Sequence, residues 1–314
     1  MTRQIILDTD IGGDVDDALA LAVGLKSTEI NLCLVTTVFT DTILRACIAH
    51  KVARICGCTD LQVAAGCNLP LMQRFVPGLA GHEGKDLLEP DDPPFTGSEH
   101  AVDALVRTIM SADQPLTLVT IGALTNIAAA LIVEPRIAER VEHICITGGH
   151  ITQAQLLGRL MPWSTDFNLI IDSEAARIVL QAPWQQITLV PVETTLQVWF
   201  DDDDRAALRA AGTPLTSALS IQIDHWLDYL HTKAGEPGSW EYETERAYLH
   251  DPLALAAVFE PRFLTFTPMH IRVEIQDGLL RTLAVDGQLP NMLVATAVDA
   301  PGFRQWMLER LTRP

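Results

Sequence analysis

The residues best suited to chemistry form an acidic loop near the N-terminus. The stretch Asp8–Asp17, with the sequence DTDIGGDVDD, holds five carboxylates within ten residues. Like charges at this density repel one another unless a cation neutralises them, and oxygen-only ligands favour Ca²⁺ or Mg²⁺. Gly12 and Gly13 let the backbone approach a ligand closely or adopt a positive φ. The alternative is a solvated acidic loop in which Asp16 and Asp17 only complement the dipole of a following helix.

The elements around this loop predict an α/β fold. Apolar runs of strand length lie at 3–8, 31–38, 116–121, 142–147 and 187–192. Helical patterns lie at 15–26, 42–56, 101–112, 124–134, 173–181, 202–210, 214–231, 252–259 and 300–311. Alternating strands and helices indicate βαβ units, so we expect one Rossmann-like domain over residues 1–314, with a mostly parallel central sheet flanked by helices. Ligands of such sheets bind at the carboxyl ends of the strands, which is where the acidic loop would lie.

Three segments depart from this alternation. The runs 269–275 and 281–286, joined by Asp277-Gly278, predict a late antiparallel pair. Segments 73–99 and 232–248 show no clear periodicity, and loops this long are usually functional lids or poorly ordered surface loops. The aromatic residues Trp240, Tyr242 and Tyr248 favour a lid for the second segment.

Composition narrows the class of partner. The chain has 314 residues, 48% of them hydrophobic, and a formal net charge of −18. An acidic surface repels phosphate backbones, so no nucleic-acid partner is expected. No apolar run reaches the roughly 18 residues of a membrane span, which predicts no membrane contact. No signal peptide is recognised, and the six cysteines include no Cys-x-x-Cys pair, so we expect reduced thiols and a cytoplasmic location.

Two later motifs could bring ligands to the same edge of the sheet. Gly122-Ala123-Leu124-Thr125-Asn126 follows a strand and opens a helix, where a backbone carbonyl could serve as a Ca²⁺ ligand. The alternative is an ordinary turn with Thr125 as the helix cap. Thr165-Asp166-Phe167-Asn168 precedes a helix expected to begin near Asp172, and Asp with Asn can bind hydroxyl groups. Its alternative is turn chemistry.

Two histidines are candidates for proton transfer. In His250-Asp251-Pro252, Asp251 is a plausible N-cap with Pro252 at the first helical position. That interpretation leaves His250 unexplained, and a histidine beside a carboxylate is a reasonable proton donor near neutral pH. His82, within the sequence GHEG, is a weaker candidate of the same kind.

Taken together, these motifs resemble those of the inosine–uridine-preferring nucleoside hydrolase family, whose usual opening is Asp-x-Asp-Pro-Gly-x-Asp-Asp-Ala. This chain has Ile11 in place of the proline and two extra residues before Asp16-Asp17. The resemblance continues, in the order of the family, at Gly122–Asn126, Thr147-Gly148-Gly149, Asp166-Phe167-Asn168, Asp172–Ala176 and His250-Asp251-Pro252.

The resemblance implies hydrolysis of the N-glycosidic bond of a ribonucleoside by a calcium-bound water, giving ribose and free base. It also implies a nucleoside hydrolase fold and a homodimer or homotetramer. The implied calcium ligands are Asp10, Asp17, the carbonyl of Thr125, and Asp251. Asp10 is also the implied base toward the water, and His250 is the implied leaving-group acid or its neighbour. Implied contacts to the ribose hydroxyls are Asp16, Asp166 and Asn168.

The segment before the His-Asp motif contributes to the base pocket in this family. His225 and Tyr229 lie four residues apart on one face of the expected helix 214–231, so we place both near the departing base, with His82 as a further candidate. The alternative is that Trp226 and Tyr229 are core residues of an amphipathic helix.

Several residues depart from the family pattern. Phe39-Thr40-Asp41 stands where the family has a short turn ending in Asn, Thr147 replaces a Met, and Asp166 replaces a Glu. An expected Asn has no clear match in residues 157–160. These positions belong to the sugar or base pocket and not to the metal ligands. The sequence therefore does not identify the nucleobase of the substrate.

Two other functions compete with this hypothesis. The order Asp8-Thr9-Asp10 after a strand resembles haloacid-dehalogenase-like phosphatases, with Asp8 as nucleophile, but none of the four lysines lies at a convincing strand end. The second competitor is a calcium-dependent nucleoside- or sugar-binding protein without efficient turnover, which the altered pocket residues would suit. Turnover of a ribonucleoside or a nitrophenyl riboside would distinguish this competitor from a hydrolase.

Overall fold

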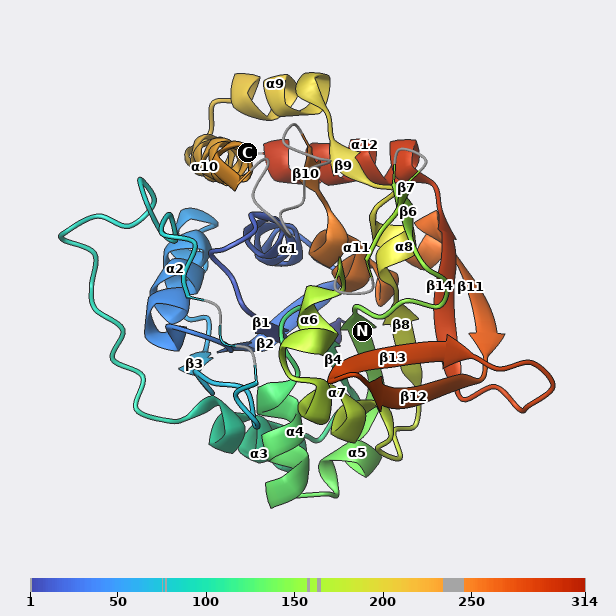
Figure 1. The fold of residues 1–314 in the computed structure, drawn as a ribbon. Coiled ribbons are helices and arrows are strands. Elements are labelled where there is room, and N and C mark those ends of the chain that lie inside the picture. The colour runs from blue at the N-terminus through green and yellow to red at the C-terminus, as the bar shows by residue number, and fades with distance from the viewer. Residues whose placement is uncertain are drawn as a thin grey trace.

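The central sheet determines where the acidic loop lies. The computed structural model describes residues 2–74, 76, 78–156, 159–162, 165–233 and 246–313. Eight strands form the sheet in the order β11-β14-β8-β5-β4-β1-β2-β3 (Figure 1). All neighbouring strands in it are parallel except β11 and β14. The bounds are β1 (Arg3–Thr9), β2 (Ile30–Thr37), β3 (Val63–Ala65), β4 (Leu116–Thr120), β5 (Val141–Thr147), β8 (Ile187–Val190), β11 (Leu264–Met269) and β14 (Met292–Val298).

Helices cover both faces of this sheet (Figure 1). One core cluster joins the sheet to α1 (Asp16–Leu25), α2 (Thr42–Ile55), α10 (Pro214–Lys233), α11 (His250–Ala257) and α12 (Ala300–Thr312). The other joins it to α3 (Ala101–Ser111), α4 (Thr125–Val133), α5 (Ile137–Arg140) and α7 (Ser173–Leu180). Short helices α6 (Phe167–Ile171) and α8 (Val192–Thr195), and helix α9 (Asp202–Ala210), complete the described helices with a 3-10 turn at Pro261–Phe263.

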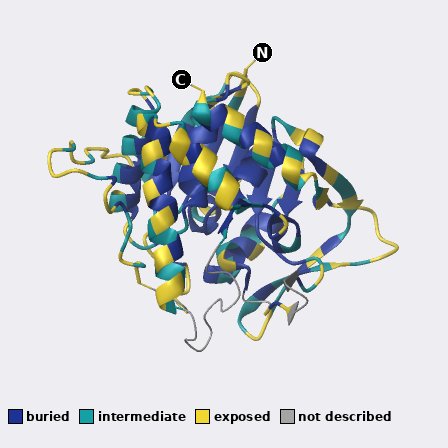
Figure 2. Ribbon diagram, turned by 90° about the horizontal axis from the view of Figure 1, so that it is seen from above, coloured by how far each residue is buried: buried dark blue, intermediate teal, exposed yellow. Residues whose placement is uncertain are grey.

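The apolar sequence of β1 explains this layering. Ile5 and Leu7 lie in one core cluster and Ile6 in the other, because successive side chains of a strand point to opposite faces. After Asp16 and Asp17, helix α1 is apolar on all sides, and it is buried along almost its whole length, as expected for a helix packed between a sheet and other helices. Buried residues concentrate in the sheet and on the inward helix faces (Figure 2).

Three two-stranded sheets lie outside the central one. The antiparallel pair β12 (Ile271–Gln276) and β13 (Leu279–Ala284) confirms the late pair predicted around Asp277-Gly278. The other pairs are β6 (Gln155–Leu156) with β7 (Arg159–Leu160), and β9 (Trp199–Phe200) with β10 (Ala247–Tyr248).

The α/β class and the mostly parallel sheet are confirmed, with several local corrections. Strands β3, β11 and β14 were not predicted, although β14 extends the central sheet beyond β8. Helix α11 begins at His250 and has Leu249 as its N-cap, so the assignment of Asp251 as N-cap was wrong. The helix start expected near Asp172 is confirmed, since α7 begins at Ser173 with Asp172 as its N-cap, but the short helix α6, which contains Phe167 and Asn168, was not predicted.

The two long aperiodic segments have different outcomes. Within residues 73–99, the described part contains turns and bends but no helix or strand. Two of the aromatic residues on which the lid hypothesis for 232–248 depended, Trp240 and Tyr242, lie outside the described residues, whereas Tyr248 is buried in strand β10. None of the described helices is long and apolar enough to cross a membrane.

The strand order creates a crevice beside β1. The chain runs from β1 outward through β2 to β3 and then returns to β4 on the other side of β1. In open α/β sheets, such a reversal opens a crevice at the carboxyl ends of the two strands, where ligands bind. The acidic loop follows β1 and the segment Gly122–Asn126 follows β4, so both lie at this switch point.

Candidate functional site

Asp8 lies beneath the crevice, near the end of β1. Its carboxylate accepts hydrogen bonds from the Thr36 hydroxyl and, at 2.8 Å, from the Asn126 side-chain amide. Burial raises the pKa of Asp8 to about 7. A phosphatase nucleophile must reach a phosphorus atom, and a fully buried carboxyl held by two neighbouring side chains does not suit that task.

Three carboxylates from two helices meet above the strand ends. Asp16 and Asp17 start α1, and Asp251 lies in the first turn of α11. Each offers an oxygen, and these oxygens lie within 4.8 Å of one another. Asp16 and Asp17 are only 3% and 4% exposed, so the solvated-loop alternative was wrong.

Electrostatics makes this arrangement unfavourable without a cation. Burial raises the pKa of Asp16, Asp17 and Asp251 well above their usual range, and the neighbouring carboxylates raise them further. Two donors offset part of this cost, since the Thr9 hydroxyl donates to Asp17 and the Asp251 amide donates to Asp16 at 3.2 Å. The site therefore offers buried, closely spaced oxygen donors, which is the donor chemistry that fits Ca²⁺.

Asp10 belongs to the same electrostatic group. Burial raises its pKa, and its charge in turn raises the pKa of Asp17 and Asp251. A Cβ atom on Gly122 would lie 2.8 Å from an Asp10 carboxylate oxygen, so the turn after β4 can pass here only as glycine. Asp10 and this turn thus lie in direct contact across the crevice.

Thr125 begins α4 on the other side of the crevice, but its hydroxyl does not cap the helix. The N-cap is Leu124, and the Thr125 hydroxyl donates to Asp172 at 2.7 Å. The structure thus places Thr125 at the switch point, as the sequence predicts. Its proposed calcium contact stays a prediction.

Two residues beside the acidic group were given no role of their own by the sequence analysis. Asp14, within the two-residue insertion, has its pKa raised to about 8 by burial and by the charge of Asp17. Arg45, buried in α2, donates to the backbone carbonyls of Asp10 and Ile11, and its positive charge lowers the pKa of Asp10. Asp14 could have been found by its place in the insertion, whereas nothing in the helical pattern of α2 singles out Arg45.

Helix α6 brings the next two candidates to the end of β4. Asp166 caps α6 through the Leu169 amide at 3.3 Å, and burial raises its pKa to about 7. The Asn168 amide donates to the Ile121 carbonyl at 3.0 Å, directly after β4. The structure therefore brings Asn168 to the switch point, and Asp166, two residues earlier, lies beside Gly148 in the turn after β5.

The altered turn at residues 39–41 also reaches α6. Phe39 and Thr40 both have positive φ, and the Phe39 ring lies edge-on to Phe167 with 5.9 Å between centroids. The altered turn thus packs against α6 through the contact between Phe39 and Phe167.

His250 stands at the first position of α11, next to Asp251. Its Nδ1 atom lies 2.6 Å from the hydroxyl oxygen of Thr195, at the end of α8. Burial lowers the pKa of His250 to about 4. Thr195 is a further residue that the sequence analysis did not identify.

His82 lies over the acidic loop together with two aromatic side chains. Its Nε2 atom is 2.8 Å from the Gly13 carbonyl oxygen, and its ring lies 5.2 Å from Tyr229 and 6.1 Å from Trp226. Trp226 and Tyr229 stack on each other and are both partly exposed, so Tyr229 is not a buried core residue. His82, Trp226 and Tyr229, hereafter the aromatic group, thus border the acidic loop.

His225 does not join the aromatic group through any contact that the structure shows. Its Nε2 atom pairs with the Asp86 carboxylate at 2.9 Å. Through this contact with Asp86, His225 connects α10 to the loop that also carries His82.

Comparison with known proteins places this arrangement in one family. Residues 5–305 match the family model described as inosine-uridine preferring nucleoside hydrolase. An inosine-uridine preferring nucleoside hydrolase from Leishmania major is 34% identical over 98% of this chain and 96% of its own. The pyrimidine-specific ribonucleoside hydrolase RihA from Enterobacter sp. (strain 638) is 30% identical over 100% of this chain and 99% of its own. Among solved structures, a purine-preferring ribonucleoside hydrolase from Gardnerella vaginalis has a TM-score of 0.83 and 25% identity, with coverage of 99% and 98%.

Proposed function

The chain belongs to the inosine-uridine preferring nucleoside hydrolase family, and on this premise we propose that its acidic site hydrolyses a ribonucleoside with the help of Ca²⁺. The protein is an N-ribosyl hydrolase, a glycosidase, as its relatives are. The observation that carries the calcium proposal is the meeting of Asp16, Asp17 and Asp251 at the switch point of the sheet.

The proposed ligands are the carboxylates of Asp10, Asp17 and Asp251 and the carbonyl of Thr125. Ca²⁺ accepts about 6–8 oxygens, so four protein ligands leave room for sugar hydroxyls and a water. Bound there, the cation would lower the pKa of that water and orient the ribose. Asp16, whose carboxylate lies in the same group, is proposed to bind a ribose hydroxyl.

The remaining steps are assigned to side chains of this chain. Cleavage of a ribosyl–base bond develops positive charge on the sugar, which nearby carboxylates stabilise. Asp10 is proposed to accept a proton from the attacking water, and Asp166 and Asn168 to bind ribose hydroxyls. His250 is proposed to assist departure of the base.

The aromatic group is the proposed wall of the base pocket. Its flat rings border the acidic loop, and a nucleobase could stack against them. The relatives differ in base preference, from pyrimidine-specific to purine-preferring, so the proposal names a ribonucleoside and no particular base. We further propose a cytoplasmic homodimer or homotetramer; sedimentation at several protein concentrations tests its oligomeric state.

Turnover with and without calcium tests the proposal. Purified protein is expected to release ribose from natural ribonucleosides and nitrophenol from nitrophenyl riboside, to lose activity on chelation, and to regain it with added Ca²⁺. Asp251→Asn should abolish activity while circular dichroism stays that of a folded protein. Calcium-dependent nucleoside binding without release of ribose would instead support the binding-protein alternative. Full activity after exhaustive chelation would refute the metal assignment.

A further inference from the structure

The antiparallel pair β12 and β13 lies outside the central sheet and is fixed to two helices. The amide of Leu280 in β13 donates to the hydroxyl oxygen of Ser173, the first residue of α7, at 3.1 Å. Strand β13 also contacts α6, the short helix that Asp166 caps. Because the strand is held in this way, its side chains have defined positions.

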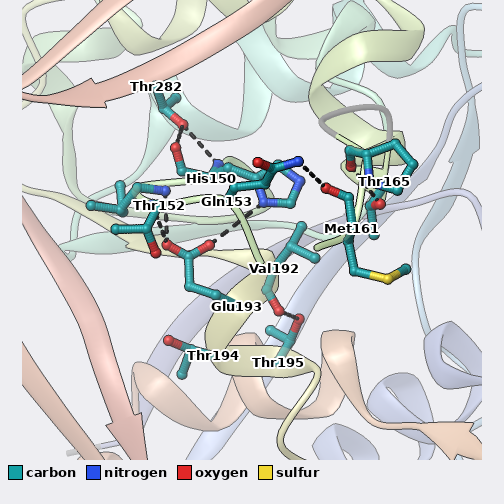
Figure 3. A network of polar contacts seen from close by, with 12 residues as sticks. His150, Thr152, Gln153, Met161, Thr165, Val192, Glu193, Thr194, Thr195 and Thr282 are labelled. Carbon is teal, nitrogen blue, oxygen red and sulfur yellow. Dashed lines mark hydrogen bonds and ion pairs between the residues drawn. The ribbon is translucent and has the colours of Figure 1, made fainter. Parts of the chain in front are cut away.

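Thr282, in β13, binds the backbone of the loop that follows β5. Its hydroxyl accepts the His150 amide at 2.8 Å and donates to the His150 carbonyl at 2.9 Å (Figure 3). A hydroxyl can do both at once, because it has one proton to donate and lone pairs that accept. The Glu193 carboxylate accepts the next two amides, those of Ile151 and Thr152, at 2.8 and 3.0 Å. Side chains from two other elements therefore fix this loop.

Two glycines connect the loop to Asp166. Gly148 and Gly149 have φ angles of 134° and 86°, which residues with a side chain rarely adopt. A Cβ atom on Gly148 would lie 2.8 Å from an Asp166 carboxylate oxygen, and one on Gly149 would lie 2.9 Å from the Thr282 hydroxyl oxygen. The backbone amide of Gly149 also donates a hydrogen bond to the Asp166 carboxylate. The glycine pair is thus closely packed against both Asp166 and Thr282.

We propose that Thr282 is a positioning residue that fixes the Asp166 carboxylate for binding of a ribose hydroxyl. By holding the backbone of His150, Thr282 keeps the adjoining glycine pair against Asp166. Thr282 is only 1% exposed, so its hydroxyl binds the loop and not the substrate. The proposal deepens the proposed function, on which the contact between Asp166 and ribose rests.

Matched substitutions separate this role from simple packing. Thr282→Val removes the hydroxyl and keeps the β-branched shape that suits a strand, whereas Thr282→Ser keeps the hydroxyl. Thr188→Val is the control, because Thr188 lies in β8, is 2% exposed, and has its hydroxyl oxygen 2.8 Å from His143 Nε2. Both valine variants lose one buried, hydrogen-bonded hydroxyl of a strand, but only Thr282→Val releases the loop after β5.

Amide hydrogen exchange, followed residue by residue with NMR, reports on the loop without any turnover. Thr282→Val should speed exchange about 10-fold or more at His150, whose amide loses its acceptor, and also at Gly149, whose amide binds Asp166. Thr282→Ser and Thr188→Val should leave both rates close to those of the wild type. Amides of β5 serve as the reference for any change in global stability.

Kinetics test whether the effect passes through Asp166. Thr282→Val should lower kcat/KM about 10-fold on natural ribonucleosides and on nitrophenyl riboside alike, because both substrates carry the ribose. In an Asp166→Ala background the same substitution should lower kcat/KM less than about 2-fold, since the carboxylate on which it acts is gone. Thr188→Val should lower kcat/KM less than about 2-fold in the presence of Asp166.

Each measurement can overturn the inference. Unchanged exchange at Gly149 in Thr282→Val would do so, as would rapid exchange at His150 and Gly149 in the wild type, which needs no variant to fold. Equal kinetic losses in Thr188→Val and Thr282→Val would show a packing effect, and an undiminished loss in the Asp166→Ala background would show that Thr282 acts elsewhere. Absence of ribose release by the wild type would refute the proposed function, whereas exchange at Gly149 would still show whether Thr282 holds the loop against Asp166.

Discussion

At the scale of single residues, burial decides how the carboxylates behave. Asp10 and Asp166 both have raised pKa values, and burial is the largest cause for each. Arg45 counteracts this effect at Asp10, where its positive charge lowers the pKa. Residues of the same type therefore differ in their suitability as a base or as a hydroxyl ligand according to their surroundings.

The first prediction compares the two groups proposed to move protons. Asp10→Asn should lower kcat about 10²- to 10⁴-fold on every substrate, because attack by water needs a base whatever the leaving group. His250→Ala should lower kcat strongly on natural nucleosides and weakly on nitrophenyl riboside, whose nitrophenolate departs without protonation. Steady-state kinetics on both substrates check this. Equal losses on both substrates for His250→Ala would rule out a leaving-group role.

The second prediction concerns pH and Asp166. Burial raises the pKa of Asp166 from 3.8 to about 7, so between these values the folded protein keeps a proton that the unfolded chain releases. Its contribution to stability therefore falls as pH rises from about 4 to 7 and is constant above. Asp166→Asn keeps a capping side chain and should gain stability over the wild type across that range, by at most about 4 kcal/mol. Denaturant unfolding in chelator at several pH values measures the difference, and a difference independent of pH would contradict it.

At the scale of elements, one buried amide joins the strand ends beneath the site. Asn126, in α4, donates to Asp8 of β1 and to the Thr37 carbonyl of β2, and accepts the Cys67 amide after β3. The Asn126 side chain thus connects the start of α4 with β1, β2 and the segment after β3. Because Asn126 follows Thr125, this network also fixes the start of α4.

The third prediction tests this network. Asn126→Ala should lower the free energy of unfolding by roughly 2–4 kcal/mol, since each buried polar group left unpaired costs about 1–3 kcal/mol. Asn31→Ala, at an exposed position of β2, is the control and should change it by less than about 0.5 kcal/mol. Equilibrium unfolding in urea measures both. Similar values for the two variants would show that the network does not stabilise the fold.

The fourth prediction concerns α10 and the base pocket. Tyr229→Phe should lower turnover of natural nucleosides more than that of nitrophenyl riboside, because a hydroxyl near the departing base matters less for a good leaving group. Calcium affinity should stay unchanged, since no metal ligand is altered. Kinetics over a panel of nucleosides and a calcium titration check both statements. Unchanged kinetics across the panel would remove Tyr229 from the pocket.

At the scale of the whole molecule, negative charge is both abundant and concentrated. The chain carries a net charge of −18, and the carboxylates of Asp16, Asp17 and Asp251 are buried at one place. Such a group destabilises the metal-free fold and favours binding of a divalent cation. Stability and calcium affinity are therefore coupled.

The fifth prediction follows from this coupling. Calcium at about 1,000 times its dissociation constant should stabilise the wild type by about 4 kcal/mol. Asp251→Asn should lose this gain and, in chelator, melt at a higher temperature than the wild type, because one buried like charge is gone. Asp113→Asn removes one negative charge at an exposed loop position. This control should keep the stabilisation by calcium and should not raise the melting temperature in chelator. Thermal melts with and without calcium decide, and a lower metal-free melting temperature for Asp251→Asn would contradict the argument.

The sequence by itself determined the fold class, the family and the dense carboxylates of Asp8–Asp17. These properties depend on local patterns, since apolar periodicity and motif spacing can be read along the chain. The extra strand β14 could not be found in this way, because its place in the sheet depends on pairing with β8, about 100 residues earlier.

Only the tertiary structure decided which side chains meet. The packing of α1 against α11 brings Asp251 to Asp16 and Asp17 across more than 230 residues of sequence. Other tertiary contacts place Thr195 of α8 against His250 and Arg45 of α2 against the Asp10 carbonyl. A local pattern contains no distance between segments so far apart, so the partners that set proton positions and charge balance became visible only in the folded chain.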